Sequence, residues 1–538
     1  METRLYPLAL IVMVIIGSIS GIFATIPVQG TAESVTSAPP DPETDVIGWE
    51  DGFWHNESIT VDQSDGLNQS EMDIWVARSM ARVEQLRKRE FIQDVPVEVI
   101  SRQEYKNRTS GRSASEDFVE WNNQVWEALF IVGEDRNVQN VLQSTTSSAV
   151  VGFYSPRDNE IKIITENPDE PTIDNATLIH ELVHALQDQH EDLTSRKFVA
   201  DTQDGTLAID GLIEGEANYI EQLYSMRCGG QWSCVRSPSS GGGGGTAGIH
   251  WGIYVTLFFP YSDGPVYVQN LVQEGGWEAV NAAYSDPPES SEQIIHVTKE
   301  KPEPIHFTDT SNQAWSLYPQ QGVSGSDTVG EASIFAMFWY QSRNYGANIL
   351  DWRQIAQVSG KFDVLDYSTP AATGWANDRV FPYYKQTQSG EKYGYVWVTK
   401  WDTQKDAAEF MQAYLKILEA QDATRRGPNT WVISEQPFAD AFHVEKQGRR
   451  VVIVNGPTVS ALTKIRTNIT IGQKTTPTPT TTHTPTPTQT STPTQTITET
   501  TTDKTPTQTT TTTGGQPGFT LGISIIVIVV LITYLRRK

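Results

Sequence analysis

Ile179-His180-Glu181-Leu182-Val183-His184 carries the most chemical information in this sequence, because it contains HELVH, an HExxH motif. Asp174, a good N-cap residue, and apolar residues at helical spacing predict that the stretch belongs to a helix. Residues four apart share a helix face, so His180 and His184 would point the same way. Two neutral imidazoles in this arrangement can bind one Zn²⁺ at about 2.0–2.1 Å and leave room for a third ligand and a water. Glu181 would flank this face as the carboxylate that takes a proton from the water.

The motif is short, and its alternative interpretation is an amphipathic helix with two surface or core histidines. The residues before it favour the metal site. Residues 150–154 and 160–164 predict two strands of a hairpin that turns at residues 156–159. A strand followed by the HExxH helix resembles the order of elements in zincin metallopeptidases.

The third metal ligand has three candidates. His190 stands where an HExxHxxGxxH pattern has its third histidine, but Gln187 replaces the glycine that would turn the chain. On a continuous helix His190 would lie about 15 Å along the axis from the first histidine. A helical pattern at residues 204–226 offers Glu214 instead, with Glu216 as the alternative ligand. If neither binds metal, both are solvated carboxylates of this helix.

Two neighbours of Glu214 support its choice. Gly215 would let this second helix approach the HELVH helix closely, because it has no side chain. Asn218 follows Glu214 by one helical turn and could support His180 or His184 through a hydrogen bond.

HELVH followed by Glu214-Gly215-Glu216-Ala217-Asn218 resembles the gluzincin metallopeptidases, whose third ligand is a Glu on a following helix, often in an E-x-E-A-D string. The resemblance covers about residues 150–226, and Asn218 stands where the family usually has Asp. It implies Zn²⁺ as the cofactor, with three ligands and one general base: His180, His184 and Glu214, and Glu181.

These residues predict a zinc-dependent peptidase that hydrolyses peptide bonds of a peptide or protein substrate with a metal-activated water. Glu181 would pass the proton of the water to the leaving amine. Candidates for the group that stabilises the oxyanion are His296, Tyr219 and Tyr224, and spacing does not choose among them. The alternative function is a non-catalytic cell-envelope protein that retains the zincin fold. The presence of Glu181 between the two histidines favours the enzyme.

Composition narrows the class of protein. The chain has 538 residues and a formal net charge of -25, which argues against a nucleic acid partner and suits a protein in concentrated salt. Its two cysteines, Cys228 and Cys234, predict a short disulfide loop if the chain is exported, and two free thiols otherwise. Two cysteines are too few for a cysteine-rich zinc site.

Both ends of the sequence contain apolar segments that predict export across a membrane or insertion into it. Residues 1–32 predict a cleaved signal peptide, with an uncleaved anchor as the alternative. Residues 470–516 are mostly Thr and Pro and predict an extended stalk. Residues 517–538 contain an apolar span followed by Arg536-Arg537-Lys538, which predicts a transmembrane helix whose basic end lies inside. The bulk of the chain would therefore lie on the extracellular face of the cell membrane.

Pro517, Gly518 and Phe519 open this last segment and resemble the PGF-CTERM sorting signal of archaeal surface proteins. Together with the acidity and the stalk, they make the chain similar to a haloarchaeal family of surface proteins. The resemblance implies processing by an archaeosortase near the tripeptide and transfer to a lipid anchor.

The sequence predicts an α+β fold. Residues 45–390 form the zincin-like metallopeptidase domain, largely helical after the glycine-rich stretch and up to about residue 384. Residues 391–457 show a β-α-β-β-β order and predict a small α+β subdomain. Sequons for N-glycosylation fit an exported surface, and they occur at Asn56, Asn68, Asn107, Asn175 and Asn468.

Overall fold

The computed structural model of the chain describes residues 39–469, apart from 110–113, 147–149, 237–247, 313 and 359. The predicted signal peptide (1–32), stalk (470–516) and sorting segment (517–538) lie outside the described residues. Among the helices that are described, none combines the length and the apolar character that crossing a membrane requires.

The fold mixes helices and strands, in agreement with the predicted α+β class, and its N-terminal part contains a three-stranded sheet in the order β3-β5-β4. The strands of this sheet are β3 (Val97–Ser101), β4 (Gly152–Ser155) and β5 (Glu160–Thr165). The antiparallel pair β4–β5 confirms the predicted hairpin, and β3 runs parallel to β5. A separate two-stranded hairpin precedes it, formed by β1 (Trp49–Glu50) and β2 (Phe53–Trp54).

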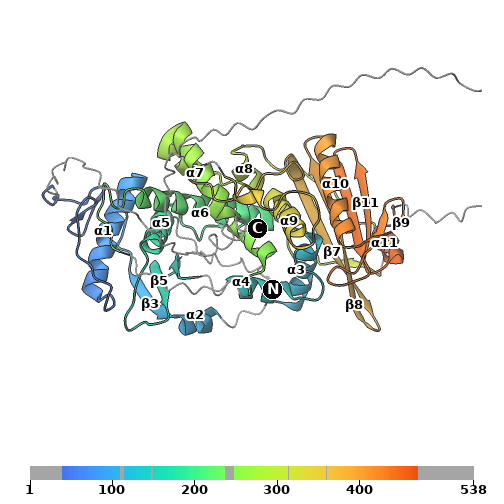
Figure 1. Cartoon of the computed structure of the whole chain (residues 1–538), viewed down its shortest axis with the longest axis horizontal. Helices are drawn as coiled ribbons and strands as arrows, with labels where there is room; N and C mark the ends of the chain where they lie inside the picture. The colour runs from blue at the N-terminus through green and yellow to red at the C-terminus, as the bar shows by residue number, and fades with distance from the viewer. Residues whose placement is uncertain are drawn as a thin grey trace, which may run out of the picture. The chain divides into compact units, whose positions relative to one another are not determined.

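Helices are the main elements of the described residues before residue 345 (Figure 1). Their bounds are α1 (Gln69–Arg87), α2 (Arg102–Thr109), α3 (Glu116–Ala128), α4 (Val138–Thr146), α5 (Asn175–Glu191), α6 (Gln203–Ser225), α7 (Trp251–Ser285), α8 (Ser291–Ile295) and α9 (Gly330–Asn344). Two short 3-10 helices lie at Arg196–Phe198 and Gln354–Ala356.

Helix α5, which contains HELVH, begins where the sequence predicts. The side chain of Asp174 accepts a hydrogen bond from the backbone N–H of Ala176 and so caps the helix. Apolar side chains of α5 pack into a core shared with α1, β5 and α6, and Leu178, Ile179, Leu182 and Val183 are fully buried. Because this packing surrounds the helix, its polar side chains can be held in fixed positions inside the protein.

Helices α6 and α7 pack against each other more closely than side chains allow. A Cβ atom on Gly215 would lie 2.5 Å from the backbone carbon of Gly264, and one on Gly264 would lie 2.5 Å from the carbonyl oxygen of Gly211. The close approach predicted for Gly215 is therefore real but was assigned to the wrong partner, since it joins α6 to α7 rather than to α5.

This contact predicts a stability defect. Gly264→Ala should lower the free energy of unfolding by about 1–3 kcal/mol, because the added methyl group overlaps the backbone of α6. Urea unfolding followed by circular dichroism measures the change. Gly230→Ala is the control, because a Cβ there meets nothing within 4 Å. Equal stabilities of the two variants would contradict the close helix crossing.

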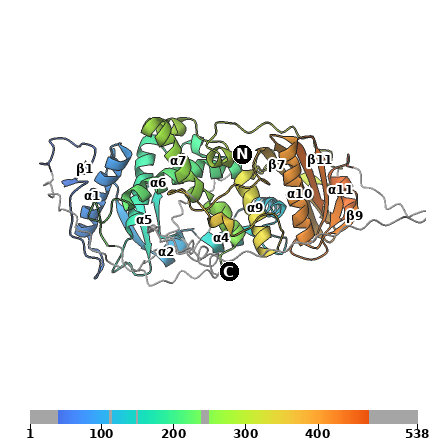
Figure 2. The ribbon, with the colours of Figure 1, turned by 45° about the horizontal axis from the view of Figure 1, so that its top comes forward.

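The C-terminal part is built on a seven-stranded antiparallel sheet in the order β6-β7-β8-β12-β11-β10-β9. Its strands are β6 (Ser316–Leu317), β7 (Trp375–Thr387), β8 (Gly390–Trp401), β9 (Thr424–Gly427), β10 (Thr430–Val432), β11 (Ala441–Gln447) and β12 (Arg450–Gly456), and its helices are α10 (Gln404–Ala420) and α11 (Val459–Ile465). Along β12, Val451 and Ile453 face the core that contains α10, whereas Val452 and Val454 face the core that contains α11. The two helices therefore cover opposite faces of the sheet (Figure 2).

The sequence prediction was wrong at the start of this part. Helical structure was expected up to about residue 384, but β7 is a strand that pairs with β8 over its whole length. The predicted boundary at residue 390/391 therefore falls inside a hairpin. A buried carboxylate explains the missed strand, since Asp378 interrupts the apolar alternation. It accepts hydrogen bonds from the indoles of Trp375 and Trp397, at 3.0 and 2.9 Å.

Candidate metal centre

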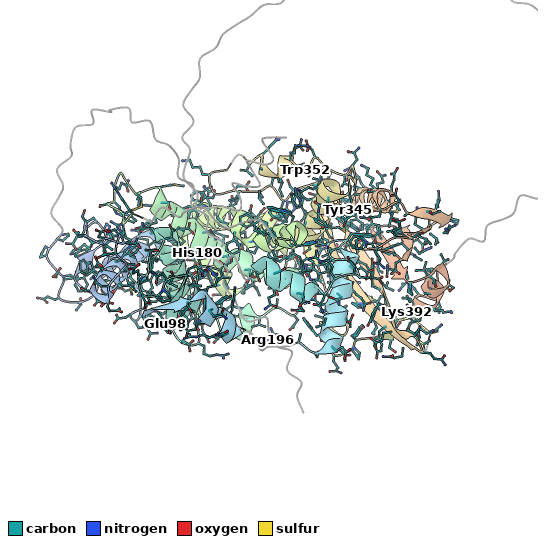
Figure 3. The ribbon with its side chains drawn as sticks, turned by 60° about the horizontal axis from the view of Figure 1, so that its bottom comes forward. Glu98, His180, Arg196, Tyr345, Trp352 and Lys392 are labelled. Atoms are coloured by element: carbon teal, nitrogen blue, oxygen red, sulfur yellow. A yellow bond between two sulfur atoms is a disulfide. The ribbon has the colours of Figure 1, made fainter. Side chains whose placement is uncertain are left out.

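The structure brings together the three side chains that were predicted to bind zinc. His180 and His184 project from α5, and Glu214 projects from α6. Glu214 Oε2 lies 3.1 Å from His180 Nε2 and 3.3 Å from His184 Nε2. One potential ligand atom from each residue falls within 4.8 Å of the other two. Figure 3 shows the position of His180 among the helices.

A hydrogen bond on the far side of His184, and a charged neighbour on the far side of His180, fix which nitrogen faces Glu214. The amide nitrogen of Gln187 donates to the carbonyl oxygen of Ile213, at 2.9 Å, so its oxygen faces His184 Nδ1, at 2.8 Å. His184 Nδ1 must then carry the proton, which leaves a lone pair on Nε2, a buried atom with no hydrogen-bond partner. His180 Nδ1 is placed similarly, 3.3 Å from Glu221 Oε2.

This arrangement fits a zinc ion. Ligand atoms of a tetrahedral Zn²⁺ with bonds of about 2.0–2.1 Å are separated by about 3.3 Å. The two distances from Glu214 Oε2, 3.1 and 3.3 Å, are close to that value. Two imidazole nitrogens and one carboxylate oxygen are also the donor set that catalytic zinc sites use, with a fourth position left for water.

Without a metal, the three side chains would hold a proton in its place. Burial disfavours a charged His180, yet its contacts with Glu214 and Glu221 raise the pKa of the imidazole to about 10. Burial acts to raise the pKa of Glu214 as well, but the two histidines outweigh it and lower that pKa to about 2. The three side chains could therefore hold a cation together, and a metal would displace the proton.

Glu181 lies beside this cluster with one oxygen free. Its Oε2 accepts a hydrogen bond of 2.7 Å from the backbone N–H of Tyr154, in β4. Its Oε1 is buried and has no hydrogen-bond partner. Burial raises the pKa of the Glu181 carboxyl to about 7, within the range of a general base at neutral pH. The hairpin that precedes the helix thus orients the carboxylate.

The contact predicted for Asn218 is made by another residue. Asn218 donates its side-chain N–H to the carbonyl oxygen of Glu214, at 2.9 Å, within its own helix. Glu221, one further turn along α6, holds His180 Nδ1, and Gln187 holds His184 Nδ1. Sequence reasoning missed both, although Glu221 follows Glu214 by seven residues and therefore shares its helix face.

These contacts predict different zinc affinities for two variants of α6. Glu221→Gln should weaken zinc binding by about 10–100-fold, because the histidine loses the carboxylate that orients it and raises its basicity. Asn218→Ala should leave the affinity unchanged. Competition with a chromophoric chelator measures both constants, and equal losses in the two variants would contradict the assignment of Glu221.

The two alternative ligands lie outside the cluster. His190 Nε2 is 2.7 Å from the carbonyl oxygen of Glu90, because α5 continues without a turn to Glu191. Glu216 forms a buried ion pair with Arg87 and accepts a hydrogen bond of 2.5 Å from Tyr284.

The three candidates for oxyanion stabilisation have other neighbours. His296 pairs with Glu331 at 2.9 Å, and the Tyr224 hydroxyl donates to Asn175 at 3.2 Å. The ring of Tyr219 contacts that of Phe362, with 4.7 Å between centroids. Each is therefore held by a contact that does not involve the three ligands.

Two other residues, which the sequence did not single out, lie close to the cluster. The ring of Tyr261, from α7, stacks on that of His180, with centroids 6.4 Å apart and planes inclined by 19°. Asp210 precedes Glu214 by one turn of α6, and burial, followed by the charge of Glu214, raises its pKa to about 8. The i, i+4 spacing could have indicated Asp210, but no local pattern connects Tyr261 with HELVH.

The cysteines and most sequons are placed as predicted. Cys228 and Cys234 are joined by a disulfide. Four of the sequon asparagines are exposed: Asn56, Asn68, Asn107 and Asn468. Asn175 is only partly exposed, and its side-chain nitrogen donates to the carbonyl oxygen of Val235. Because a glycan would be attached to that nitrogen, the prediction for Asn175 conflicts with the fold.

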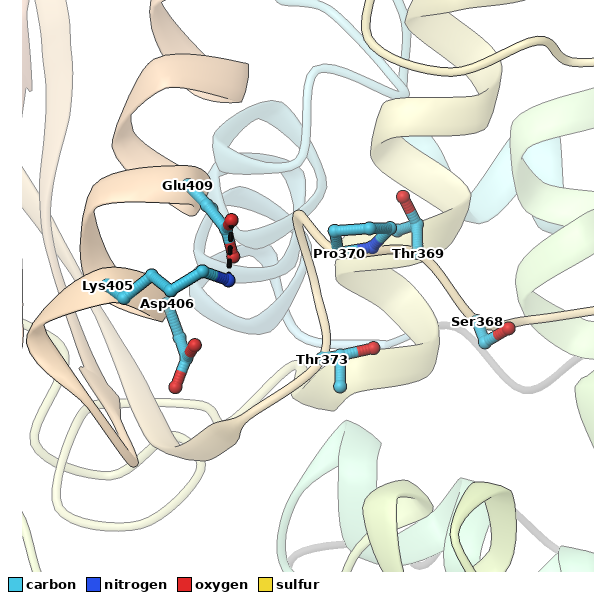
Figure 4. A pocket seen from close by; sticks show the side chains of 7 residues that line it. All are labelled: Ser368, Thr369, Pro370, Thr373, Lys405, Asp406 and Glu409. Carbon is cyan, nitrogen blue, oxygen red and sulfur yellow. Dashed lines mark ion pairs between the residues drawn. The ribbon is translucent and has the colours of Figure 1, made fainter.

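A pocket of about 290 Å³ lies elsewhere, between α10 and the segment before β7 (Figure 4). It is lined by Ser368, Thr369, Pro370, Thr373, Lys405, Asp406 and Glu409. Lys405 and Glu409 pair across 2.7 Å at its rim. None of the metal-centre residues lines this pocket, so we assign it no part in the chemistry.

A comparison with protein-family models gives a match in the C-terminal part of the chain. A family model described as "Domain of unknown function (DUF8575)" matches residues 317–466, which extend from β6 to α11. No curated protein and no solved structure matches the chain. The matched region contains the seven-stranded sheet, and the metal centre on α5 and α6 lies before it.

Proposed function

We propose that this protein is a zinc-dependent metallopeptidase with a zincin-like fold that hydrolyses peptide bonds of a peptide or protein substrate. One observation carries the proposal: Glu181 Oε1, a buried carboxylate oxygen without a partner, lies beside two histidines and a glutamate whose potential ligand atoms converge. A zinc site that only stabilises the fold does not require this additional carboxylate. The resemblance of HELVH and the Glu214 string to gluzincins supports the same conclusion.

Each residue has a distinct role in this proposal. His180, His184 and Glu214 would hold Zn²⁺, which, when bound, polarises the scissile carbonyl and lowers the pKa of water toward about 7. The N–H of Tyr154 holds one oxygen of Glu181, so the other is free to accept a proton from water and to pass it to the leaving amine. For the oxyanion we propose Tyr261, because its ring stacks on His180, whereas the contacts described for His296, Tyr219 and Tyr224 do not involve the three ligands.

The second candidate is a non-catalytic envelope protein with a closed zinc site, and burial favours it. The exposed fractions of His180, Glu181, His184 and Glu214 are 1%, 0%, 0% and 5%. Because these side chains are buried, a substrate can reach them only after α7 or a neighbouring segment moves.

Cobalt substitution separates the two functions. In a peptidase the fourth coordination position is open, so a hydroxamate added to the Co²⁺ form should change its visible spectrum. The zinc form should also cleave an unfolded protein substrate. A closed site would show one bound metal, an unchanged cobalt spectrum and no cleavage, and this combination would refute the peptidase.

We also propose that the enzyme acts at the outer face of the cell membrane. The signal peptide, the Thr/Pro-rich stalk and the Pro517-Gly518-Phe519 segment support this location. Mass spectrometry of the mature protein tests it: cleavage near Pro517 with a lipid on the new C-terminus indicates archaeosortase processing, and an intact C-terminus indicates a retained transmembrane helix.

A further inference from the structure

A second group of acidic side chains lies between α3 and the seven-stranded sheet. Glu127 is in the last turn of α3, Glu134 is in the segment that follows, and Asp440 directly precedes β11. One carboxylate oxygen from each lies within 4.8 Å of the other two. The backbone supports the approach of these segments, since the N–H of Glu134 donates to the carbonyl oxygen of Pro437 at 3.0 Å.

These charges lack adequate compensation inside the protein. Glu127 and Asp440 are only 5% and 3% exposed, and Glu127 Oε1 is buried with no hydrogen-bond partner. Burial, and then repulsion by neighbouring carboxylates, raise the pKa values of Glu127 and Asp440 well above their usual range. Lys392 of β8 offsets part of the negative charge on Glu134 and Asp440, but its side chain is exposed.

An independent observation in the sheet points to a ligand. Asn455, in β12, is 0% exposed, and neither Oδ1 nor Nδ2 of its side chain has a hydrogen-bond partner. The side chain of Asn455 is nevertheless close enough to Asp440 to lower the pKa of that carboxyl group, so it lies next to the acidic group. Buried amides are normally satisfied, and an amide oxygen beside carboxylates is a typical ligand of Ca²⁺.

We propose that Glu127, Glu134, Asp440 and the amide oxygen of Asn455 form a Ca²⁺ site that fastens α3 and the segment after it to the seven-stranded sheet. All four donors are oxygens, as a hard cation requires, and no nitrogen or sulfur ligand is among them. Two oxygens on opposite sides of a Ca²⁺ with bonds of 2.3–2.6 Å are about 5 Å apart, so oxygens that all lie within 4.8 Å of one another can bind the same ion. Waters can complete the coordination from the side of the exposed Glu134.

This site is separate from the zinc centre. Figure 3 shows Lys392, which lies near the acidic group, well apart from His180. The calcium site therefore does not depend on the proposed peptidase function. Its expected effect is on stability, because it joins segments that are about 300 residues apart in the sequence.

Terbium luminescence tests the proposal on the zinc-loaded chain in concentrated NaCl, which suppresses weak binding to the acidic surface. Tb³⁺ occupies Ca²⁺ sites and luminesces when excited aromatic rings are near, and Tyr395 lies close enough to interact with Glu127 and Asp440. We expect one equivalent of sensitised Tb³⁺, displaced by Ca²⁺ and not by equal Mg²⁺. We also expect Ca²⁺ to raise the Tm.

Substitutions make the test specific. Asp440→Asn and Glu134→Gln should each weaken Ca²⁺ binding by about tenfold or more and remove the effect on Tm, while zinc content stays constant. Glu134 is exposed, so Glu134→Gln should fold even if Asp440→Asn does not. The control is Glu391→Gln, which removes a carboxylate of β8 outside the acidic group. Absence of a saturable signal, or equal binding by Glu134→Gln and the control, would overturn the proposal.

Discussion

Glu181→Gln should reduce kcat for peptide cleavage by about 10²–10⁴-fold and leave zinc content unchanged. The glutamine has the same shape, and its amide oxygen can still accept the hydrogen bond from the N–H of Tyr154. It cannot accept a proton from water. The rest of the site, including the contacts of Glu221 with His180 and of Gln187 with His184, is untouched by the substitution.

The measurement is the initial rate of cleavage of a quenched fluorescent peptide library, together with metal analysis of the same samples. Glu191→Gln is a matched control, because Glu191 is a carboxylate at the end of the same helix and outside the metal cluster. Wild-type rates in Glu181→Gln would exclude Glu181 as the general base. Loss of zinc in this variant would show instead that Glu181 is a ligand.

Glu214→Ala should remove zinc almost completely. Contacts outside the coordination shell change metal affinity by about 10–100-fold, so the loss of one of three protein ligands should exceed that range. Activity should be lost with the metal. Zinc at about 100 times its dissociation constant stabilises a folded protein by about 2.7 kcal/mol, and the variant should lose this stabilisation.

Glu216→Gln provides the contrast, because Glu216 was the alternative third ligand. Its carboxylate pairs with Arg87 inside the protein. We expect this variant to be destabilised by about 3–5 kcal/mol, since Arg87 is left buried without its partner, and to retain zinc. Calorimetry with and without added zinc measures both effects. If Glu216→Gln loses zinc and Glu214→Ala retains it, the ligand assignment is wrong.

Local patterns in the sequence were sufficient to predict the helices and strands that form the candidate metal centre. A cap residue and helical spacing predicted α5, and two short apolar stretches predicted the β4–β5 hairpin. The spacing of four residues predicted that His180 and His184 share one face of the helix. Glu214 could be chosen from the helical pattern at residues 204–226 and from the resemblance of Glu214-Gly215-Glu216-Ala217-Asn218 to the gluzincin string. Apart from the choice of Glu214, these predictions depend on interactions within about seven residues, which the sequence displays directly.

The group of Glu127, Glu134 and Asp440 could not be predicted from local sequence patterns. Glu127, Glu134 and Asp440 have no spacing that relates them, and only the packing of α3 on the sheet brings them together. The strand β7 was missed for a similar reason, since the buried Asp378 accepts hydrogen bonds from groups that include the indole of Trp397 and the backbone N–H of Gly330, which are distant in the sequence.

The sequence by itself determined the faces of the helices, and the tertiary structure decided what each face touches. Glu214, Asn218 and Glu221 lie on one stripe of α6, so the sequence identified the correct side of the helix. Which of them reaches His180 depends on how α6 is rotated and shifted along α5, and the close contact of Gly215 with α7 contributes to setting that position. Helical spacing contains no information about the relative placement of two helices, because side chains from distant parts of the chain determine it.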